Sequence, residues 1–149
     1  NDSIKRIGEA TSMRQSGYDM VDDDVLGELT EIYLEAARKD VSELESYISS
    51  VFEDRNLWEN ACLEMRKVTH NVKGQGTSFG YPLMTQIGES LSRLLKAIHQ
   101  PQDPQLKLVE AHVTALRLVM DQNIQGQGGD QGTLLVSRLE DLVRKLAPA

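Results

Sequence analysis

The residues of this chain that could do chemistry lie close together in the stretch THNVKGQGTSFGY, residues 69–81. His70 supplies an imidazole, much of which is unprotonated and therefore nucleophilic near neutral pH. Lys73 follows three residues later and would bring an ammonium group close to any anion attached to that ring. An imidazole with a cation beside it is suited to carrying an anionic group, such as a phosphoryl group. Three glycines accompany the pair, although each glycine inside a helix costs about 1 kcal/mol relative to alanine.

A helical wheel over residues 57–80 places His70 on an outward face. At about 100° per residue, five apolar side chains form one buried stripe: Ala61, Met65, Val68, Val72 and Phe79. His70 lies about 170° from the centre of this stripe, so we expect its ring to face solvent. Its outward neighbours would form a docking face, namely Leu63, Arg66, Lys67 and Thr77, together with Lys73 and Gly74. Arg66 and Lys67 add the positive charge that a phosphoryl group would need.

The glycines then have separate explanations. Gly74 stands one turn after His70 on the same ridge, where a side chain would cover the imidazole. Its lack of a side chain leaves room for a second protein to approach the ring. Gly80 suits a helix C-terminus, where a left-handed residue is often required. Gly76 falls at the edge of the buried stripe and predicts the close approach of a neighbouring helix.

The longest predicted helix begins at the acidic run Asp22–Asp24 and ends near Asp54. Three adjacent carboxylates supply an N-cap and favourable negative charge at a helix start. Apolar residues then recur at spacings of three and four, including Leu26, Leu29, Ile32, Tyr33, Ala36, Leu44, Tyr47, Ile48 and Val51. A shorter helix is expected before it, over Ser3–Met13.

Three further helices have recognisable starts. Asn56 and Glu59 match a capping box at the start of the histidine-bearing helix, which we expect to run to the turn before Pro82. Pro82 suits the first position of the next helix, and Asp103 with Pro104 repeats the cap-then-proline signal. These two helices carry apolar stripes at Leu83, Ile87, Leu91, Leu94 and Ile98, and at Leu106, Val109, Val113, Leu116, Met120 and Ile124.

The C-terminal part completes an all-α prediction. The segment GQGGDQG, residues 126–132, predicts a flexible loop, and Thr133 would cap a last helix over about 133–147. Helices joined by short connections favour an antiparallel four-helix bundle with additional N- and C-terminal helices. We expect one domain over residues 1–149, with its core at about 22–124.

Composition argues against several other classes of function. A net charge of −7 argues against a nucleic-acid binder, and neither a membrane-spanning run nor a signal peptide is evident. Cys62 is the single cysteine, and His99 and His112 lack a second ligand one helical turn away, so we expect no metal site. The two histidines are expected to be structural or surface residues. A cytoplasmic location fits best, and the start at Asn1 leaves membership of a longer protein open.

The stretch HNVKGQGTSFG resembles the signature of histidine-containing phosphotransfer domains. That signature has a histidine, any residue, an aliphatic residue and Lys-Gly, followed by small residues and a second glycine ten positions after the histidine. Here the matching residues are His70, Val72, Lys73, Gly74, Ser78 and Gly80. The ending SFGY is also similar to the phosphotransfer domain of bacterial chemotaxis histidine kinases. The resemblance covers about residues 22–124.

The resemblance implies a phosphorelay intermediate of two-component signalling. His70 would exchange a phosphoryl group with the aspartate of a response-regulator receiver domain or with a histidine kinase, and Lys73 would stabilise the phosphate. Mg²⁺ would sit on the receiver, so the chain itself would need no cofactor. Because the chain shows no P-loop or kinase nucleotide motif, we expect a phosphocarrier without an ATP site and not an enzyme. It could also be a fragment of a larger histidine kinase.

One position departs from the family pattern. Family members often carry Gln or Glu on the next helix, where it orients the imidazole, and the match here is Ser92. Glu89, one turn earlier, is the alternative orienter. The alternative function is a non-catalytic helical module that binds receiver or kinase domains through the face from Leu63 to Thr77. Leu63 itself is either part of that docking face or an ordinary exposed leucine.

Overall fold

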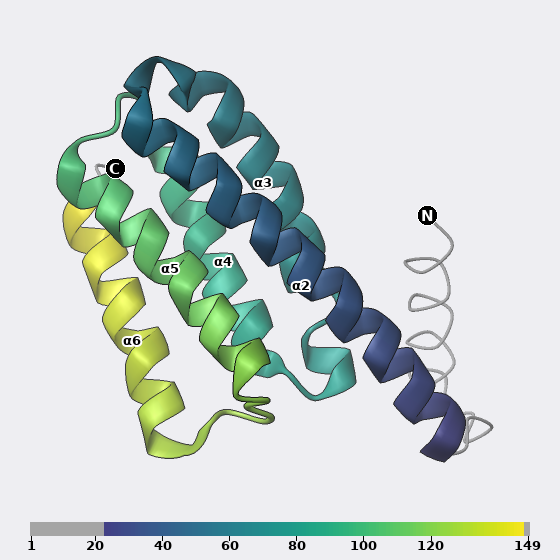
Figure 1. Cartoon of the computed structure of the whole chain (residues 1–149). Coiled ribbons are helices and arrows are strands. Elements are labelled where there is room, and N and C mark those ends of the chain that lie inside the picture. The colour runs from purple at the N-terminus through teal and green to yellow at the C-terminus, as the bar shows by residue number, and fades with distance from the viewer. Residues whose placement is uncertain (1–22, 148–149) are drawn as a thin grey trace.

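The computed structural model describes residues 23–147, and their regular secondary structure is entirely helical, without a strand (Figure 1). The five α-helices are α2 (Asp23–Glu53), α3 (Trp58–Gly74), α4 (Pro82–Ala97), α5 (Asp103–Asp121) and α6 (Gly129–Leu146). Two short 3₁₀ helices, η1 (Arg55–Leu57) and η2 (Thr77–Phe79), lie on either side of α3. The all-α prediction is confirmed. The helix expected over Ser3–Met13, and Asp22 of the acidic run, lie outside the described residues.

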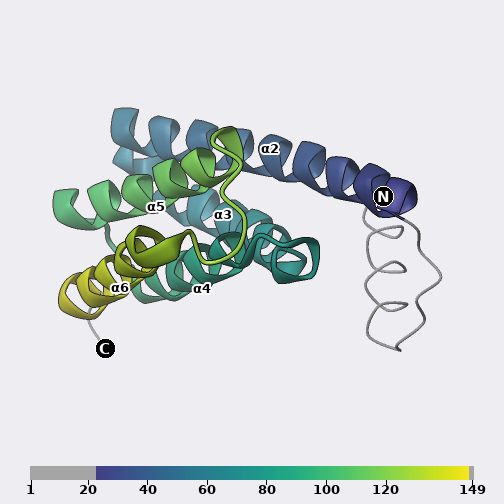
Figure 2. The ribbon, with the colours of Figure 1, turned by 90° about the horizontal axis from the view of Figure 1, so that it is seen from below.

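Successive helices run in alternating directions and pack side by side (Figure 1). Helix α2 packs against α3 and α5, and α4 packs against the same two helices from the other side. Helix α6 lies against α4 and α5, on the side remote from α2 (Figure 2). The outward faces of α2 and α3 are therefore left uncovered by α6.

The sequence predicts the buried stripes of α3, α4 and α5, but the stripe of α2 only in part. In α2, the predicted Leu26, Ile32, Ala36 and Tyr47 are only partly buried, whereas Leu34, Ala37 and Val41 are buried as well. All five apolar residues of the α3 stripe are buried, and so are the five of the α4 stripe. The α5 stripe is buried except for the partly exposed Ile124. Each fully buried leucine or isoleucine stabilises the fold by about 1.5–3 kcal/mol relative to an exposed one. This burial fixes the rotation of α3 about its own axis, and with it the face that α3 presents to solvent.

The ends of α3 differ from the prediction. Asp54, and not Asn56, is the capping residue, because its carboxylate accepts a hydrogen bond of 3.0 Å from the Asn56 amide and so begins η1. Glu59 lies in the first turn of α3 and closes no capping box. At the other end α3 stops at Gly74, before the expected turn. Gly80, with φ of +89°, ends η2 instead of α3.

The starts of α5 and α6 also need correction. Gln102 and Gln105 form the capping box of α5, while the expected cap Asp103 is the first helical residue and pairs with Arg55. Helix α6 begins at Gly129, inside the segment predicted to be a flexible loop. It can begin there because Gly132 has no side chain, since a Cβ would lie 1.9 Å from the carbonyl oxygen of Gln127. Thr133 therefore does not cap α6, and its hydroxyl donates to the Gly129 carbonyl within the helix.

The segment after α5 returns to the turn that follows η2. The Gly126 amide donates a hydrogen bond of 2.9 Å to the carbonyl of Gly80. Nearby, the Tyr81 hydroxyl donates to the side-chain oxygen of Asn123. The C-terminal segment is thus tied to the connection between α3 and α4.

Two glycines let α3 and α4 approach closely. A Cβ on Gly88 would lie 2.7 Å from the Cβ of Lys73, so the stem of this lysine crosses α4 where α4 has no side chain. A Cβ on Gly76 would lie 2.7 Å from the hydroxyl of Thr85 and 2.8 Å from the carbonyl of Tyr81. The close approach predicted at Gly76 is confirmed. Gly88 also allows a close approach of the two helices, which the sequence analysis did not predict.

Replacing Gly88 by alanine should destabilise the protein. Overpacking costs about 1–3 kcal/mol, and alanine returns up to about 1 kcal/mol of helix propensity. We therefore expect Gly88→Ala to lower the free energy of unfolding by up to about 2 kcal/mol in urea titrations. The matched control is Gly27→Ala in α2, where a Cβ meets nothing within 4 Å and a gain of about 0.5–1 kcal/mol is expected. Equal effects of the two substitutions would contradict the close approach.

Candidate functional site

His70 is exposed on the outward face of α3, as the helical wheel predicts. The residues around it in sequence anchor that helix, because Val68, Thr69 and Val72 are buried. Within residues 23–147, the imidazole forms no hydrogen bond and no ion pair. The ring is thus an accessible nucleophile on a well-anchored support.

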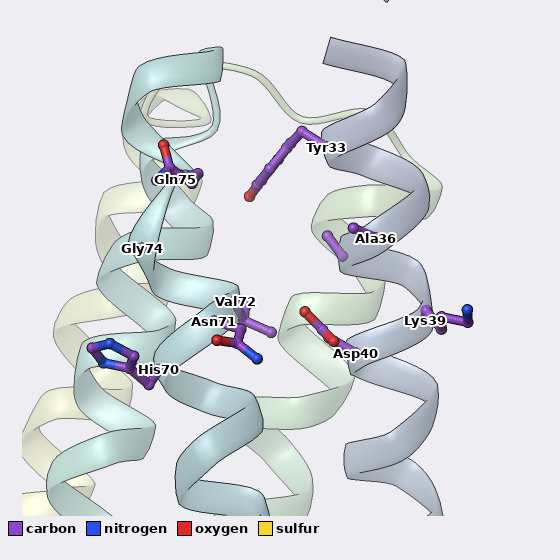
Figure 3. Close-up of a pocket in the computed structure, with 10 residues that line it drawn as sticks. Tyr33, Ala36, Lys39, Asp40, His70, Asn71, Val72, Gly74 and Gln75 are labelled. Carbon is purple, nitrogen blue, oxygen red and sulfur yellow. The ribbon is translucent and has the colours of Figure 1, made fainter. Parts of the chain in front are cut away.

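Two hollows open on either side of His70, and both include the histidine in their lining. The α3–α4 hollow has a volume of about 450 Å³, and its lining residues are Leu63, Arg66, Lys67, His70, Asn71, Lys73, Ser92 and Lys96. The α2–α3 hollow has a volume of about 250 Å³ and is lined by residues between Tyr33 and Asp40 and between His70 and Gln75 (Figure 3). His70 therefore stands on the ridge between two concave surfaces.

The α3–α4 hollow is strongly cationic, with four basic side chains and no carboxylate in its lining. Lys67 forms an ion pair with Glu64 at 3.3 Å, but an exposed ion pair of this kind contributes little to stability. Arg66 and Lys96 form no ion pair with any described residue. Positive charge is therefore available beside the imidazole, in a protein whose net charge is −7. This charge would stabilise an anion attached to the ring.

Lys73 is held at this hollow by α4. Its ammonium lies 3.1 Å from a carboxylate oxygen of Glu89, and its side chain is 19% exposed. The hydrogen bond from Lys73 is the main reason that the pKa of Glu89 is lowered. Arg93 lies 3.9 Å from the other oxygen of Glu89. Glu89 thus positions the lysine instead of the imidazole.

Ser92 is buried and shares the α3–α4 hollow with His70, whereas Glu89 is absent from the lining. Neither residue hydrogen-bonds the imidazole within the described part of the chain. Of the two expected orienters, Ser92 is the one that lies with the histidine.

The other predicted site residues take up distinct places. A Cβ on Gly74 would meet nothing within 4 Å, so the fold itself does not require glycine there. Leu63 is 51% exposed at the α3–α4 hollow. Thr77 lines neither of the two hollows. Its amide and its hydroxyl are instead each 3.0 Å from the hydroxyl of Thr85 on α4.

The α2–α3 hollow contains two polar side chains that the sequence analysis did not place near His70. Asp40 reaches into it from α2, and Tyr33 comes from the same face two turns earlier (Figure 3). Burial is the largest effect raising the pKa of Asp40 to about 6; Glu43 raises it further and Lys39 opposes the rise. The sequence pattern places Tyr33 in the apolar stripe of α2, and its ring stacks on Phe79. The spacing of Tyr33 and Asp40, seven residues apart, indicates that both side chains lie on the same face of the helix, and this was the available signal in the sequence.

The other two histidines do not belong to a metal site in the described part of the chain. His112 is buried, with one ring nitrogen 2.8 Å from the Ser90 hydroxyl and the other 2.7 Å from the Leu108 carbonyl. Burial lowers the pKa of His112, which favours a neutral structural histidine. His99 is exposed. Residues 23–147 contain no cluster of three metal-ligating side chains, and no helix among them has the length and apolar character needed to cross a membrane.

Comparison of the chain with protein-family models, with curated proteins and with solved structures gave no match.

Asp40 should make stability depend on pH in a defined direction. With a native pKa of about 6 and an unfolded value of about 3.9, the native state binds more protons than the unfolded state between these values. Stability therefore falls as pH rises through this window and does not recover above it. We expect Asp40→Asn to raise the free energy of unfolding at pH 7.5, with a gain that shrinks toward pH 4.

The measurement is a series of urea titrations between pH 4 and pH 8. Glu31→Gln, an exposed change on the same helix, serves as the matched control. A gain from Asp40→Asn that is independent of pH would show that the carboxylate is not destabilised by its surroundings.

Proposed function

We propose that this chain is a cytoplasmic phosphorelay intermediate that carries a phosphoryl group on His70. The observation that carries the proposal is an exposed, unpaired imidazole at the rim of a cationic hollow. In this proposal α2–α5 act as an antiparallel four-helix bundle of the histidine phosphotransfer type. The partners are response-regulator receiver domains, a histidine kinase, or both.

The proposed step is a reversible phosphoryl transfer. An unprotonated ring nitrogen of His70 attacks the phosphorus of a receiver's aspartyl phosphate. The N–P bond forms as the acyl P–O bond breaks, and the receiver's carboxylate leaves with the bonding electrons. The other ring nitrogen keeps its proton. The chain acts as a carrier and uses no ATP, and Mg²⁺ is expected on the receiver.

The residues around His70 would neutralise charge, attract the partner and leave it access to the ring. Lys73, released in part from Glu89, would neutralise charge on the transferred group, and Arg66, Lys67 and Lys96 would attract the acidic partner. The open space above Gly74 would admit the receiver. Such positioning and charge neutralisation supply most of the catalysis in phosphoryl transfer.

Replacing His70 should abolish labelling without unfolding the protein. Incubation with a panel of phosphorylated receiver domains should give acid-labile, base-stable phosphate on the wild type and none on His70→Gln. His99→Gln removes another exposed histidine and should label normally. Labelling of His70→Gln at the wild-type level would rule out the assignment. Binding of a receiver by the wild type without transfer would favour the non-catalytic interaction module.

Replacing Lys73 should slow transfer to His70. Loss of one charge-assisted hydrogen bond of about 1.5 kcal/mol corresponds to about tenfold in rate. We expect Lys73→Ala to lower the transfer rate about tenfold, while Lys107→Ala, an exposed lysine of α5, leaves it unchanged. Rapid-quench measurements with one receiver would compare the two variants. Equal transfer rates for Lys73→Ala and the wild type would show that Lys73 does not assist the transfer.

A further inference from the structure

The α2–α3 hollow has the features of a second binding site, distinct in charge from the hollow on the other side of His70. Figure 3 shows Asp40 and Asn71 facing each other across the gap between α2 and α3. Lys39 also contributes to the lining of the hollow, although its ammonium is directed away from Asp40 in this view. Ala36, Ala37 and Val72 supply apolar wall. The site therefore combines an apolar wall with several polar side chains, among them one carboxylate.

Two of its polar groups lack partners. The Tyr33 side chain is 3% exposed and points toward α3, and its hydroxyl has no hydrogen bond in the described part of the chain (Figure 3). Asp40 is partly buried and forms neither a hydrogen bond nor an ion pair with a described residue. An unpaired buried hydroxyl destabilises the fold, and burying part of a carboxylate adds to this cost. A ligand that supplies the missing partners would remove both costs.

We propose that the α2–α3 hollow receives one cationic side chain of the protein that docks over His70, with Asp40 as its counter-ion. The Tyr33 hydroxyl accepts a hydrogen bond from the same ammonium or guanidinium group, and the alkyl stem lies against Ala36 and Val72. The identity of the docking protein rests on the proposed function. The volume of about 250 Å³ suits one side chain, because pockets for whole small-molecule ligands are about 300–1,000 Å³.

Charge complementarity selects this occupant. Both hollows share His70 and Asn71, so one partner that covers the imidazole also covers both. The α3–α4 side presents four cationic side chains. The α2 side presents Asp40, which has Glu43 and Lys39 as charged neighbours of opposite sign and forms no ion pair with either. A partner must therefore place an anionic surface over α3–α4 and a basic side chain over α2–α3. Opposite charges on the two sides of the ring fix the orientation of docking.

The first test measures binding of a small probe to the whole chain by amide chemical shifts in ¹H–¹⁵N spectra. We expect n-butylammonium to give saturable shifts at Ala36, Val72 and Gly74, and 1-butanol, its neutral analogue, to give none. Asp40→Asn should weaken n-butylammonium binding at least tenfold, and Tyr33→Phe should weaken it severalfold. Equal binding of the two probes, equal binding by Asp40→Asn and the wild type, or no binding to the wild type would each overturn the proposal.

The second test separates this pocket from the chemistry of His70. With a phosphorylated receiver as donor, Asp40→Asn should raise KM at least fivefold and leave kcat within twofold. With phosphoramidate, a donor too small to span the hollows, the variant and the wild type should be labelled equally. An unchanged KM for the receiver would overturn the proposal. Failure of all labelling would instead contradict the proposed function, and the n-butylammonium titration would still decide the role of Asp40.

Discussion

The close packing of α4 against α3 at Gly88, and against the segment after α3 at Gly76, is the constraint on which the site depends. Because Gly88 has no side chain, the stem of Lys73 lies directly on α4, and its ammonium reaches Glu89 on the same helix. The buried stripe of α3 fixes the rotation of the helix, and this contact fixes its distance from α4. Together they place His70, Lys73 and the cationic hollow on one surface.

This surface combines features that oppose folding stability. Four basic side chains converge on one hollow, and Asp40 and Tyr33 are left without partners at the other. Clustered like charges and unpaired buried polar groups are costly in a fold that is only marginally stable. Their place on both sides of one exposed imidazole is explained if a binding partner compensates them. Sites of this kind are where local stability is commonly given up for function.

Features that follow from the helical spacing of apolar residues could be predicted from the sequence. The α3 stripe repeats at helical spacing, so the outward direction of His70 could be derived without coordinates. The helix ends could not, because they depend on competition between nearby polar groups, as at Asp54 and Asn56. Gly132 shows the same limit, since only the structure brings the Gln127 carbonyl against it and allows α6 to begin early.

Contacts between helices were the other missing information. Glu89 was expected near the imidazole, but its partner is Lys73, and the spacing along α4 alone could not distinguish the two. Asp40 and Tyr33 belong to a helix remote in sequence from His70, so their proximity to it required the packing of α2 on α3.

The hydrogen bond from Gly126 to Gly80 bears on where the smallest autonomous unit of this protein ends. The left-handed turn after η2 uses a backbone donor contributed from beyond α5, and α6 adds Val136, Leu139 and Val143 to the core. A version shortened to α2–α5 would therefore expose apolar surface on α4 and α5 and leave the Gly80 carbonyl without this donor. The last helix is an integral part of the scaffold beneath the histidine, although it lies on the side remote from α2.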